Sequence, residues 1–269
     1  MRRFRTLSVL FSCLLAASCA SNGLSNIKAS YSGISPEYMR LGDKASAIAQ
    51  ATRPIIHDRI LADYLLAIRT RLLANTGIGK VPGRIYVLAD RSIYAYSLPN
   101  GDIFITTGLL SLARSDAELS AVIGHELGHI LLGHYRRAVE QQEKISRELT
   151  RSDARASYPQ KHLDAAFAAV MHFGASRTME TEADRAMLQL QEHAGYDPCG
   201  AQWMFAKLVA VGRQTDPAAD RTHLFDTHPA TPERLHALEA QLHGHKCNGT
   251  DPGPSESYRV NVLDRLPAK

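Results

Sequence analysis

The sequence has few of the features that mark specialised classes of protein. Only 7% of its 269 residues are aromatic and 22% are charged, 45% are hydrophobic, and no segment repeats. This balance excludes disordered, collagen-like and polytopic membrane proteins and is typical of a globular protein. A chain of this length removes roughly three quarters of its unfolded surface from water, so it can form a core without metals or disulfides as supports.

A strong excess of charge is also missing. The formal net charge is +4, and Arg2, Arg3 and Arg5 supply three of these charges at the N-terminus, which leaves one net positive charge for the rest of the chain. A nearly neutral body does not offer the basic surface that nucleic-acid binding requires. We therefore expect no nucleic-acid partner.

Long hydrophobic runs are scarce, and the run near the N-terminus is too short to cross a bilayer. It covers Leu7–Ala20, whereas a transmembrane helix needs ~20 apolar residues. After three arginines, such a run is typical of a secretory signal peptide. Residues Leu15–Cys19 also resemble a bacterial lipoprotein box, although Ala16 stands where such boxes prefer Leu. Two interpretations stay open: cleavage before Cys19 with lipid attached to that cysteine, or ordinary cleavage after Ala20.

Cysteine is rare as well. Two of the four cysteines lie in the N-terminal segment just described, and the others are Cys199 and Cys247. Two cysteines in an exported chain favour one disulfide, which here would join the start of one predicted helix to the end of another. His243 and His245 stand near Cys247, and we interpret them as bystanders in a tail rather than as a second metal site.

Composition divides the chain into four regions. We expect a signal peptide over residues 1–18, a tether rich in Ser, Asn and Gly over 19–42, a folded domain over 43–245 and a flexible tail over 246–269. A dense run of charge extends from Arg136 to Lys161. We interpret it as a solvated helix and loop, and the alternative of a lid over the site stays open.

Hydrophobic spacing inside the folded domain changes from helical to strand-like and back. Apolar residues recur every three to four positions over Arg59–Asn75, which predicts a helix. Strands are expected over Arg84–Ala89 and Asp102–Thr107. Ser115 has the sequence pattern of a capping box and predicts the start of another helix. Three more helices are expected over residues 178–194, 201–211 and 232–242. The sequence therefore predicts an α+β fold, helix-rich, with a small and mostly antiparallel sheet.

One short motif points to a specific chemistry, the sequence His125-Glu126-Leu127-Gly128-His129. Residues four apart lie on one face of a helix, so both imidazoles can reach one ion. This H-E-x-x-H pattern is the signature of zinc proteases, in which zinc makes a water molecule acidic and the glutamate takes its proton. The sequence therefore predicts one Zn²⁺ per chain with Glu126 as the base. The simpler alternative is that both histidines are ordinary residues of an amphipathic helix.

A third metal ligand must come from another part of the chain. Metzincins continue the motif with a glycine and a third histidine, but Leu132 and Tyr135 occupy those positions here. His134 cannot easily replace that histidine. On a continuous helix it would be turned roughly 140° away from His129.

A downstream segment offers carboxylates with suitable spacing. Glu180 and Asp184 share one helical face, so that one can bind zinc while the other orients a ligand histidine. Glu182 faces another side. The alternative is a surface helix with ordinary ion pairs, such as Glu182 with Arg185.

Taken together, these motifs resemble the HtpX and CAAX-prenyl-protease family of zinc metalloendopeptidases, gluzincins whose third ligand is glutamate. The resemblance extends over residues 46–242 and is nearest to the small periplasmic lipoprotein branch of the family. Besides the two motifs above, it is carried by Leu98–Gly101, Thr107–Leu110, Thr227–Pro229 and Arg234. The family has Gly where this chain has Asn100, and we expect Asn100 to adopt positive φ, which Asn tolerates better than most residues.

The resemblance implies roles for individual residues. His125, His129 and Glu180 would be the zinc ligands and Glu126 the catalytic base. Asp184 would support a ligand without binding the metal.

His228 is open to two interpretations. It could cap the next helix or simply pack, or, as the resemblance implies, it could approach the active site. There it could donate to the oxyanion or occupy the open zinc position as a reversible plug. Arg234 is a weaker candidate for the same electrostatic role, with helix-surface pairing as the alternative.

The resemblance implies a zinc-dependent metalloendopeptidase of the bacterial cell envelope that cleaves unfolded or misassembled envelope proteins. A predicted edge strand over residues 94–98 is a place where an extended peptide can add through its backbone, which implies weak sequence specificity. The expected location is the periplasm, with an outer-membrane anchor through lipid on Cys19. The alternative function is a latent protease that acts mainly as a chaperone or binding module in outer-membrane protein quality control. A purely structural zinc is least favoured, because such sites have four protein ligands and no base.

Overall fold

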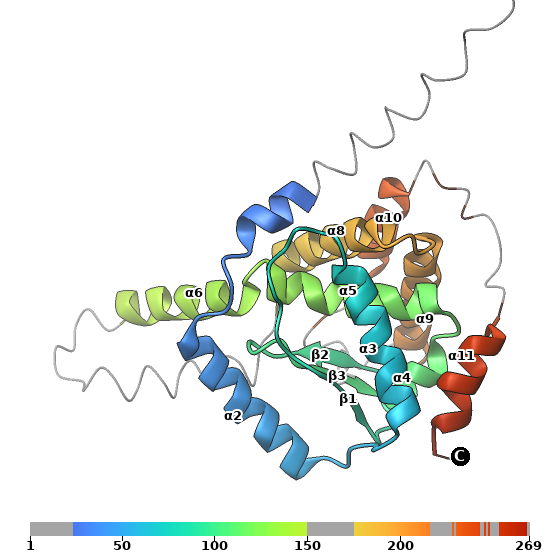
Figure 1. Cartoon of the computed structure of the whole chain (residues 1–269). Coiled ribbons are helices and arrows are strands. Elements are labelled where there is room, and N and C mark those ends of the chain that lie inside the picture. The colour runs from blue at the N-terminus through green and yellow to red at the C-terminus, as the bar shows by residue number, and fades with distance from the viewer. Residues whose placement is uncertain are drawn as a thin grey trace, which may run out of the picture.

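The computed structural model describes residues 24–149, 175–215, 228, 230–242, 245, 247 and 253–267. Its fold is α+β, as expected, with helices packed around one small sheet (Figure 1). The signal peptide, Cys19 and the second half of the charged run fall outside the described residues. No helix among the described residues combines the length and the apolar character that a bilayer span requires.

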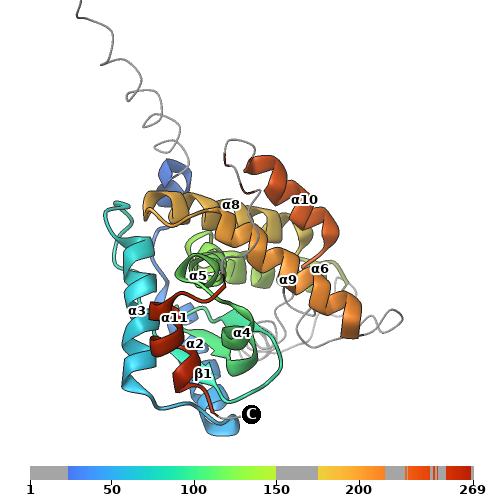
Figure 2. The ribbon, with the colours of Figure 1, turned by 90° about the vertical axis from the view of Figure 1, so that its right-hand side faces the viewer.

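Helix α5 (Asp116–Leu131) is the central element. It begins where the capping pattern predicts, because the Ser115 side chain accepts a hydrogen bond from the Glu118 amide. Nearly all of its side chains are buried, as expected for a helix covered on every side. Figure 2 looks almost along α5 and shows helices on one side of it and the sheet on the other.

Helix α8 (Arg177–His193) runs alongside α5 at very short range. Gly128 makes this approach possible, since a Cβ at that position would lie 3.0 Å from the Ala183 Cα. A larger residue at 128 would force the two helices apart. The close contact therefore fixes the spacing between side chains on α5 and those on α8.

The sheet contains β1 (Ile85–Leu88), β2 (Ala95–Ser97) and β3 (Ile103–Thr106) in the order β1-β3-β2. β2 pairs antiparallel with β3, as expected, but β1 pairs parallel with β3. The expectation of a mostly antiparallel sheet is therefore wrong for that pair. The reason is that β3 lies between β1 and β2, and local sequence does not determine with which earlier strand a later strand pairs. β2 is left at an edge, as predicted.

The turn before β3 corrects one expectation about backbone conformation. Gly101, not Asn100, adopts positive φ, at 89°. Asn100 instead uses its side-chain amide to donate hydrogen bonds to Asp43 and Asp102. A side chain that can bind two carboxylates gives Asn a role that glycine cannot fill.

The remaining predicted helices are all present. They are α3 (Arg59–Leu73), α8, α9 (Cys199–Thr215) and α10 (Pro232–Gln241), the last capped by Thr231. The structure adds α2 (Pro36–Thr52) and α4 (Thr107–Leu112), and it shows the helix expected in the charged run as α6 (His134–Leu149). α6 covers the first part of the charged run and projects from the rest of the molecule (Figure 1).

Two segments expected to be loose are folded. Residues 24–30 are helical, and Leu24 and Ile27 join the main core. Helix α11 (Glu256–Asn261), followed by the short 3-10 helix η1 (Leu263–Arg265), packs against α3. Tyr258 on α11 is fully buried, and its hydroxyl donates to the Leu110 carbonyl. Polar composition suggested a tether and a tail, but a few apolar side chains determine the structure of these segments.

The predicted disulfide between Cys199 and Cys247 is confirmed. It joins the first residue of α9 to the segment that follows α10. These two helices, together with the residues between Cys199 and Cys247, form a covalently closed arm, called the C-terminal arm below.

Candidate metal centre and active site

Four side chains converge in the interior beside the sheet. His125 and His129 come from α5, Glu180 comes from the first turn of α8, and His228 comes from the C-terminal arm before α10. Their ligand atoms all lie within 4.8 Å of one another. The Nε2 atoms of His125 and His129 are 3.1 Å apart, and each is 3.4 Å from an oxygen of Glu180.

The atoms of this cluster suit a zinc ion. Zinc binds nitrogen and oxygen ligands at about 2.0–2.2 Å in a tetrahedron, which places ligand atoms roughly 3.3 Å apart. The other ring nitrogen of each histidine is already engaged. Nδ1 of His125 is 3.0 Å from Asp184, and Nδ1 of His129 is 2.8 Å from His134. Both Nε2 atoms therefore point to one place, together with a carboxylate, as metal ligands do.

The pKa values of the side chains in the cluster are strongly shifted from their usual ranges. Burial raises the pKa of Glu180, but hydrogen bonds with His125 and His228 outweigh it and hold that pKa well below its usual range. Burial lowers the pKa of His125, yet hydrogen bonds to Asp184 and Glu180 raise it to about 10. The pKa of His129 is lowered by burial and by the neighbouring histidines. Opposite shifts on adjacent buried groups are typical of functional sites.

Arg234 on α10 compensates the buried negative charge. Its Nε and Nη2 donate to the two carboxylate oxygens of Asp184 at 2.9 and 2.7 Å, and its Nη1 is 2.7 Å from Glu180. The guanidinium also stacks over the Phe205 ring at 4.9 Å. Arg234 therefore does not form the helix-surface pair that was the alternative. From the C-terminal arm, it holds the carboxylates of Asp184 and Glu180 in place.

Residues 61–242 of the chain match peptidase family M48. The chain belongs to this family. The match covers most of α3, the whole sheet and every element that contributes to the cluster. The curated proteins to which the chain is similar include beta-barrel assembly-enhancing proteases and the metalloprotease LoiP.

The similarity to individual relatives is moderate. The beta-barrel assembly-enhancing protease of Yersinia pestis is 25% identical over 238 residues, which are 85% of this chain and 47% of the relative. Its counterpart in Escherichia coli K12 is 24% identical over 208 residues, 73% of this chain and 42% of the relative. LoiP of the same strain is 30% identical over 189 residues, 67% and 70% of the two chains. This M48 chain thus spans about half the length of the first two relatives.

His134 supports the metal cluster, a role that was not predicted from the sequence. His134 does not belong to the group of possible metal ligands, as expected, but its Nδ1 lies 2.8 Å from Nδ1 of His129. Its Nε2 is 3.0 Å from Glu182, which also pairs with Arg137. His134 would face away from His129 only on a continuous helix, whereas α5 ends before a turn in which Gly133 adopts positive φ. The H-E-x-x-H motif followed by a glycine and another histidine was the available signal.

The environment of Glu126 was also not foreseen. This carboxylate is buried, and its Oε2 accepts a hydrogen bond of 2.8 Å from the Ser97 hydroxyl on edge strand β2. Its Oε1 lies 4.0 Å from Nε2 of His228. Tyr135 donates to the Ser97 carbonyl and so fixes the end of β2 over the helix. Glu126 is therefore oriented by β2, and Tyr135 holds β2 in position.

Two smaller sequence interpretations concern side chains outside the cluster. Glu182 pairs with Arg137 and His134, so the suggested pairing with Arg185 is wrong. His245 lies 3.5 Å from Glu192, and His243 falls outside the described residues.

Proposed function

We propose that this chain is a zinc-dependent metalloendopeptidase that hydrolyses peptide bonds of unfolded or misassembled envelope proteins. The observation that carries this proposal is the buried group of His125, His129 and Glu180 with the Glu126 carboxylate beside it. The names of the relatives, which are proteases, support the reaction class. A beta-barrel assembly-enhancing role in two of them supports envelope proteins as substrates.

The proposed chemistry assigns one task to each group. Bound zinc would act as a Lewis acid that makes water reactive and polarises the peptide carbonyl. Glu126 takes a proton from the attacking water and passes it to the departing amine, since one carboxylate can act as base and then as acid. Ser97 holds Glu126 in position, and Asp184 holds His125. His125, His129 and Glu180 would hold the metal.

Substrate can approach along the edge of the sheet. Among the described residues β2 pairs with β3 alone, so its other edge, apart from the Ser97 carbonyl that Tyr135 binds, is available to an extended peptide. The same strand carries Ser97, the partner of Glu126. A peptide added there passes next to the base.

His228 has a proposed role in the reaction itself. Its Nδ1 is 2.8 Å from Glu180 and its Nε2 is 4.0 Å from Glu126, so it occupies the space between ligand and base. From there it can act as a plug over the metal or donate to the oxyanion. His228→Ala is expected to change turnover of casein while the protein retains zinc. Kinetics identical to those of the unsubstituted protein would contradict this role.

The location is proposed from the N-terminal sequence. A signal peptide followed by lipid on Cys19 would place the chain in the periplasm, anchored to the outer membrane. Labelling with a fatty acid analogue, compared with Cys19→Ser, tests the anchor. Label that persists in the variant would show that lipid is attached at another residue.

The decisive experiment compares the mature protein with Glu126→Gln, using unfolded casein as substrate and measuring zinc content in both. Near one zinc per chain in both proteins, with cleavage only by the unsubstituted one, is expected. Zinc without cleavage by either protein would favour the latent, chaperone-like alternative. Absence of zinc from both would overturn the assignment of the site.

A further inference from the structure

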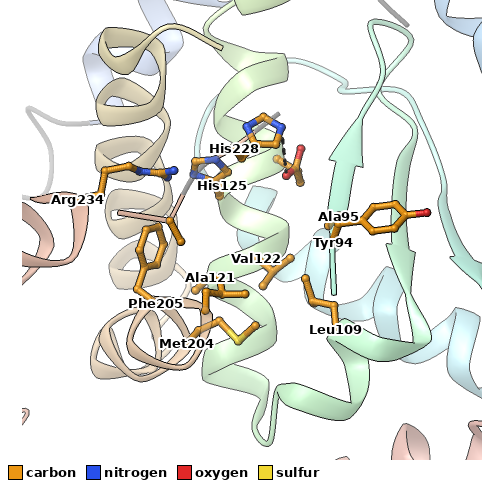
Figure 3. Close-up of a pocket in the computed structure, with 13 residues that line it drawn as sticks. Tyr94, Ala95, Leu109, Ala121, Val122, His125, Met204, Phe205, His228 and Arg234 are labelled. Atoms are coloured by element: carbon orange, nitrogen blue, oxygen red, sulfur yellow. Dashed lines mark ion pairs between the residues drawn. The ribbon is translucent and has the colours of Figure 1, made fainter. Parts of the chain in front are cut away.

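The two histidines of α5 that would bind the metal lie in different surroundings. His125 lines an open pocket together with His228 and Arg234, and Figure 3 shows these three side chains along the upper side of that pocket. His129 does not line the pocket, and none of its surface is exposed. Solvent therefore does not orient the His129 ring, and its orientation depends on the protein groups behind it.

The groups behind the two histidines also differ. Nδ1 of His125 is 3.0 Å from the carboxylate of Asp184. Nδ1 of His129 is 2.8 Å from Nδ1 of His134, and Nε2 of His134 is 3.0 Å from Oε2 of Glu182. His129 is thus connected to a carboxylate as well, but through a second imidazole.

The direction of each hydrogen bond in this series follows from the proposed metal site. A histidine that binds zinc through Nε2 carries its proton on Nδ1, so His129 donates from Nδ1. The acceptor is Nδ1 of His134, which must therefore bear a lone pair. The proton of this neutral ring then lies on Nε2 and is donated to Glu182, because an ionised carboxylate only accepts. A single tautomer of each ring satisfies the whole series.

A surface ion pair between Glu182 and Arg137 does not account for the position of Glu182. Both side chains are partly exposed, at 32% and 38%, and such a pair contributes little by itself. The His134 side chain is fully buried, so its Nε2 proton would lose its acceptor if Glu182 turned away. Arg137 donates to both oxygens of Glu182 and so holds the carboxylate against His134.

We infer that Glu182 is a positioning residue of the metal centre, which acts on His129 through His134. The inference rests on the proposed zinc site and adds to it a carboxylate two hydrogen bonds away from the ligand. Its charge selects the His134 tautomer that accepts from His129, and this holds Nε2 of His129 toward the metal. The first turn of α6, which carries His134 and Arg137, is thereby coupled to the metal centre.

The first test observes the tautomer by nitrogen-15 nuclear magnetic resonance of zinc-loaded protein with labelled histidine. The signals missing from His134→Asn identify His134. In the unsubstituted protein, His134 is expected to carry its proton on Nε2. In Glu182→Gln a mixture of both tautomers is expected, because an amide can accept or donate. A proton on Nδ1 of His134 in the unsubstituted protein would overturn the inference, whatever the variants show.

Zinc affinity, measured by competition with a chelator, tests the consequence for the metal. Glu182→Gln is expected to bind zinc about tenfold more weakly, at the lower end of the effect of groups that support a ligand. Glu192→Gln makes the same change on the same helix, at an exposed carboxylate 3.5 Å from His245, and should leave the affinity unchanged. Equal zinc affinity of Glu182→Gln and the unsubstituted protein would overturn the inference.

A double variant shows whether Glu182 acts through His134. Glu182→Gln combined with His134→Asn is expected to bind zinc as weakly as His134→Asn alone, within about twofold, because the connection to His129 is already broken. A further loss of about tenfold in the double variant would show that the two residues act independently. That result would also overturn the inference.

These measurements separate the inference from the proposed peptidase function. If the protein binds zinc and cleaves no peptide, the proposed function fails, and the tautomer and the zinc affinity still decide the role of Glu182. If it binds no zinc, the metal-free protein decides, because Glu182 contacts His134 directly. A His134 tautomer that Glu182→Gln leaves unchanged would then overturn the inference.

Discussion

The α5–α8 pair and the C-terminal arm contribute to the same site by different physical means. In the helix pair, positions depend on helical spacing and on the close contact at Gly128, and the side chains that would bind metal are buried. In the arm, which a disulfide closes around α9 and α10, Arg234 and His228 contact carboxylates of α8. The helix pair supplies three of the four possible ligands, whereas the arm supplies the Arg234 counter-charge, the Phe205 ring beneath it and His228. Metal binding and turnover should therefore respond to changes in different regions.

The sharpest test of the helix pair is Glu180→Gln. This change removes the charged ligand, so zinc affinity is expected to fall by more than about 100-fold, since residues that merely support ligands already contribute roughly 10–100-fold. Competition with a chelator, followed by metal analysis, measures it. Glu140→Gln on α6, an exposed residue, is the control. Retained zinc in Glu180→Gln would place the third ligand elsewhere.

Arg234→Leu breaks the link between the two regions. It leaves the carboxylates of Glu180 and Asp184 buried without their counter-charge, and the expected loss is about 3–5 kcal/mol in the free energy of unfolding. Urea denaturation measures this loss. Arg136→Leu removes an exposed pair on α6 and should cost less than about 1 kcal/mol. Equal effects of the two changes would contradict the role given to Arg234.

Removing the disulfide tests the arm alone. Cys199→Ser combined with Cys247→Ser is expected to lower the free energy of unfolding by about 2–4 kcal/mol, because the unfolded chain is no longer closed over 48 residues. Zinc content should persist, since His125, His129 and Glu180 lie on α5 and α8, outside the arm. Reducing agent should lower the urea midpoint of the unsubstituted protein and leave the double variant unaffected. Loss of zinc from the double variant would show that the two regions are not separable.

The smallest expected effect belongs to His134→Asn. His134 orients His129 through a ring-to-ring contact, so its removal should weaken zinc binding by about 10–100-fold with little change in overall fold. His236→Asn on α10, whose side chain is 88% exposed, is the matched control. Unchanged zinc affinity in His134→Asn would mean that His129 is held by the rest of α5.

Sequence reasoning succeeded where chemistry imposes local spacing. The positions of His125 and His129 follow from helical geometry, and the disulfide follows from the number of cysteines left after the N-terminal segment. It failed where contacts join distant elements. The Arg234 pairing with Asp184 spans 50 residues, and the parallel pairing of β1 with β3 depends on how the chain crosses the sheet.

Composition was misleading where single residues determine whether a segment folds. Tyr258 stands in a polar segment, yet its burial anchors α11 to the body. Leu24 and Ile27 do the same at the other end. Average composition describes how a segment interacts with water. One aromatic or two aliphatic side chains can nevertheless bury enough apolar surface to order one or two helical turns.

Edge strand β2 has a consequence for how copies of the protein behave together in solution. A long, flat strand edge is a template for aggregation, because any other chain can continue the sheet. β2 is three residues long, so it offers a neighbouring copy only a short ladder of backbone hydrogen bonds. Self-association through this edge is therefore weak, and a peptide held there dissociates readily unless a side chain also anchors it. The brevity of the strand thus limits self-association through this edge, and it would let a peptide bound there exchange.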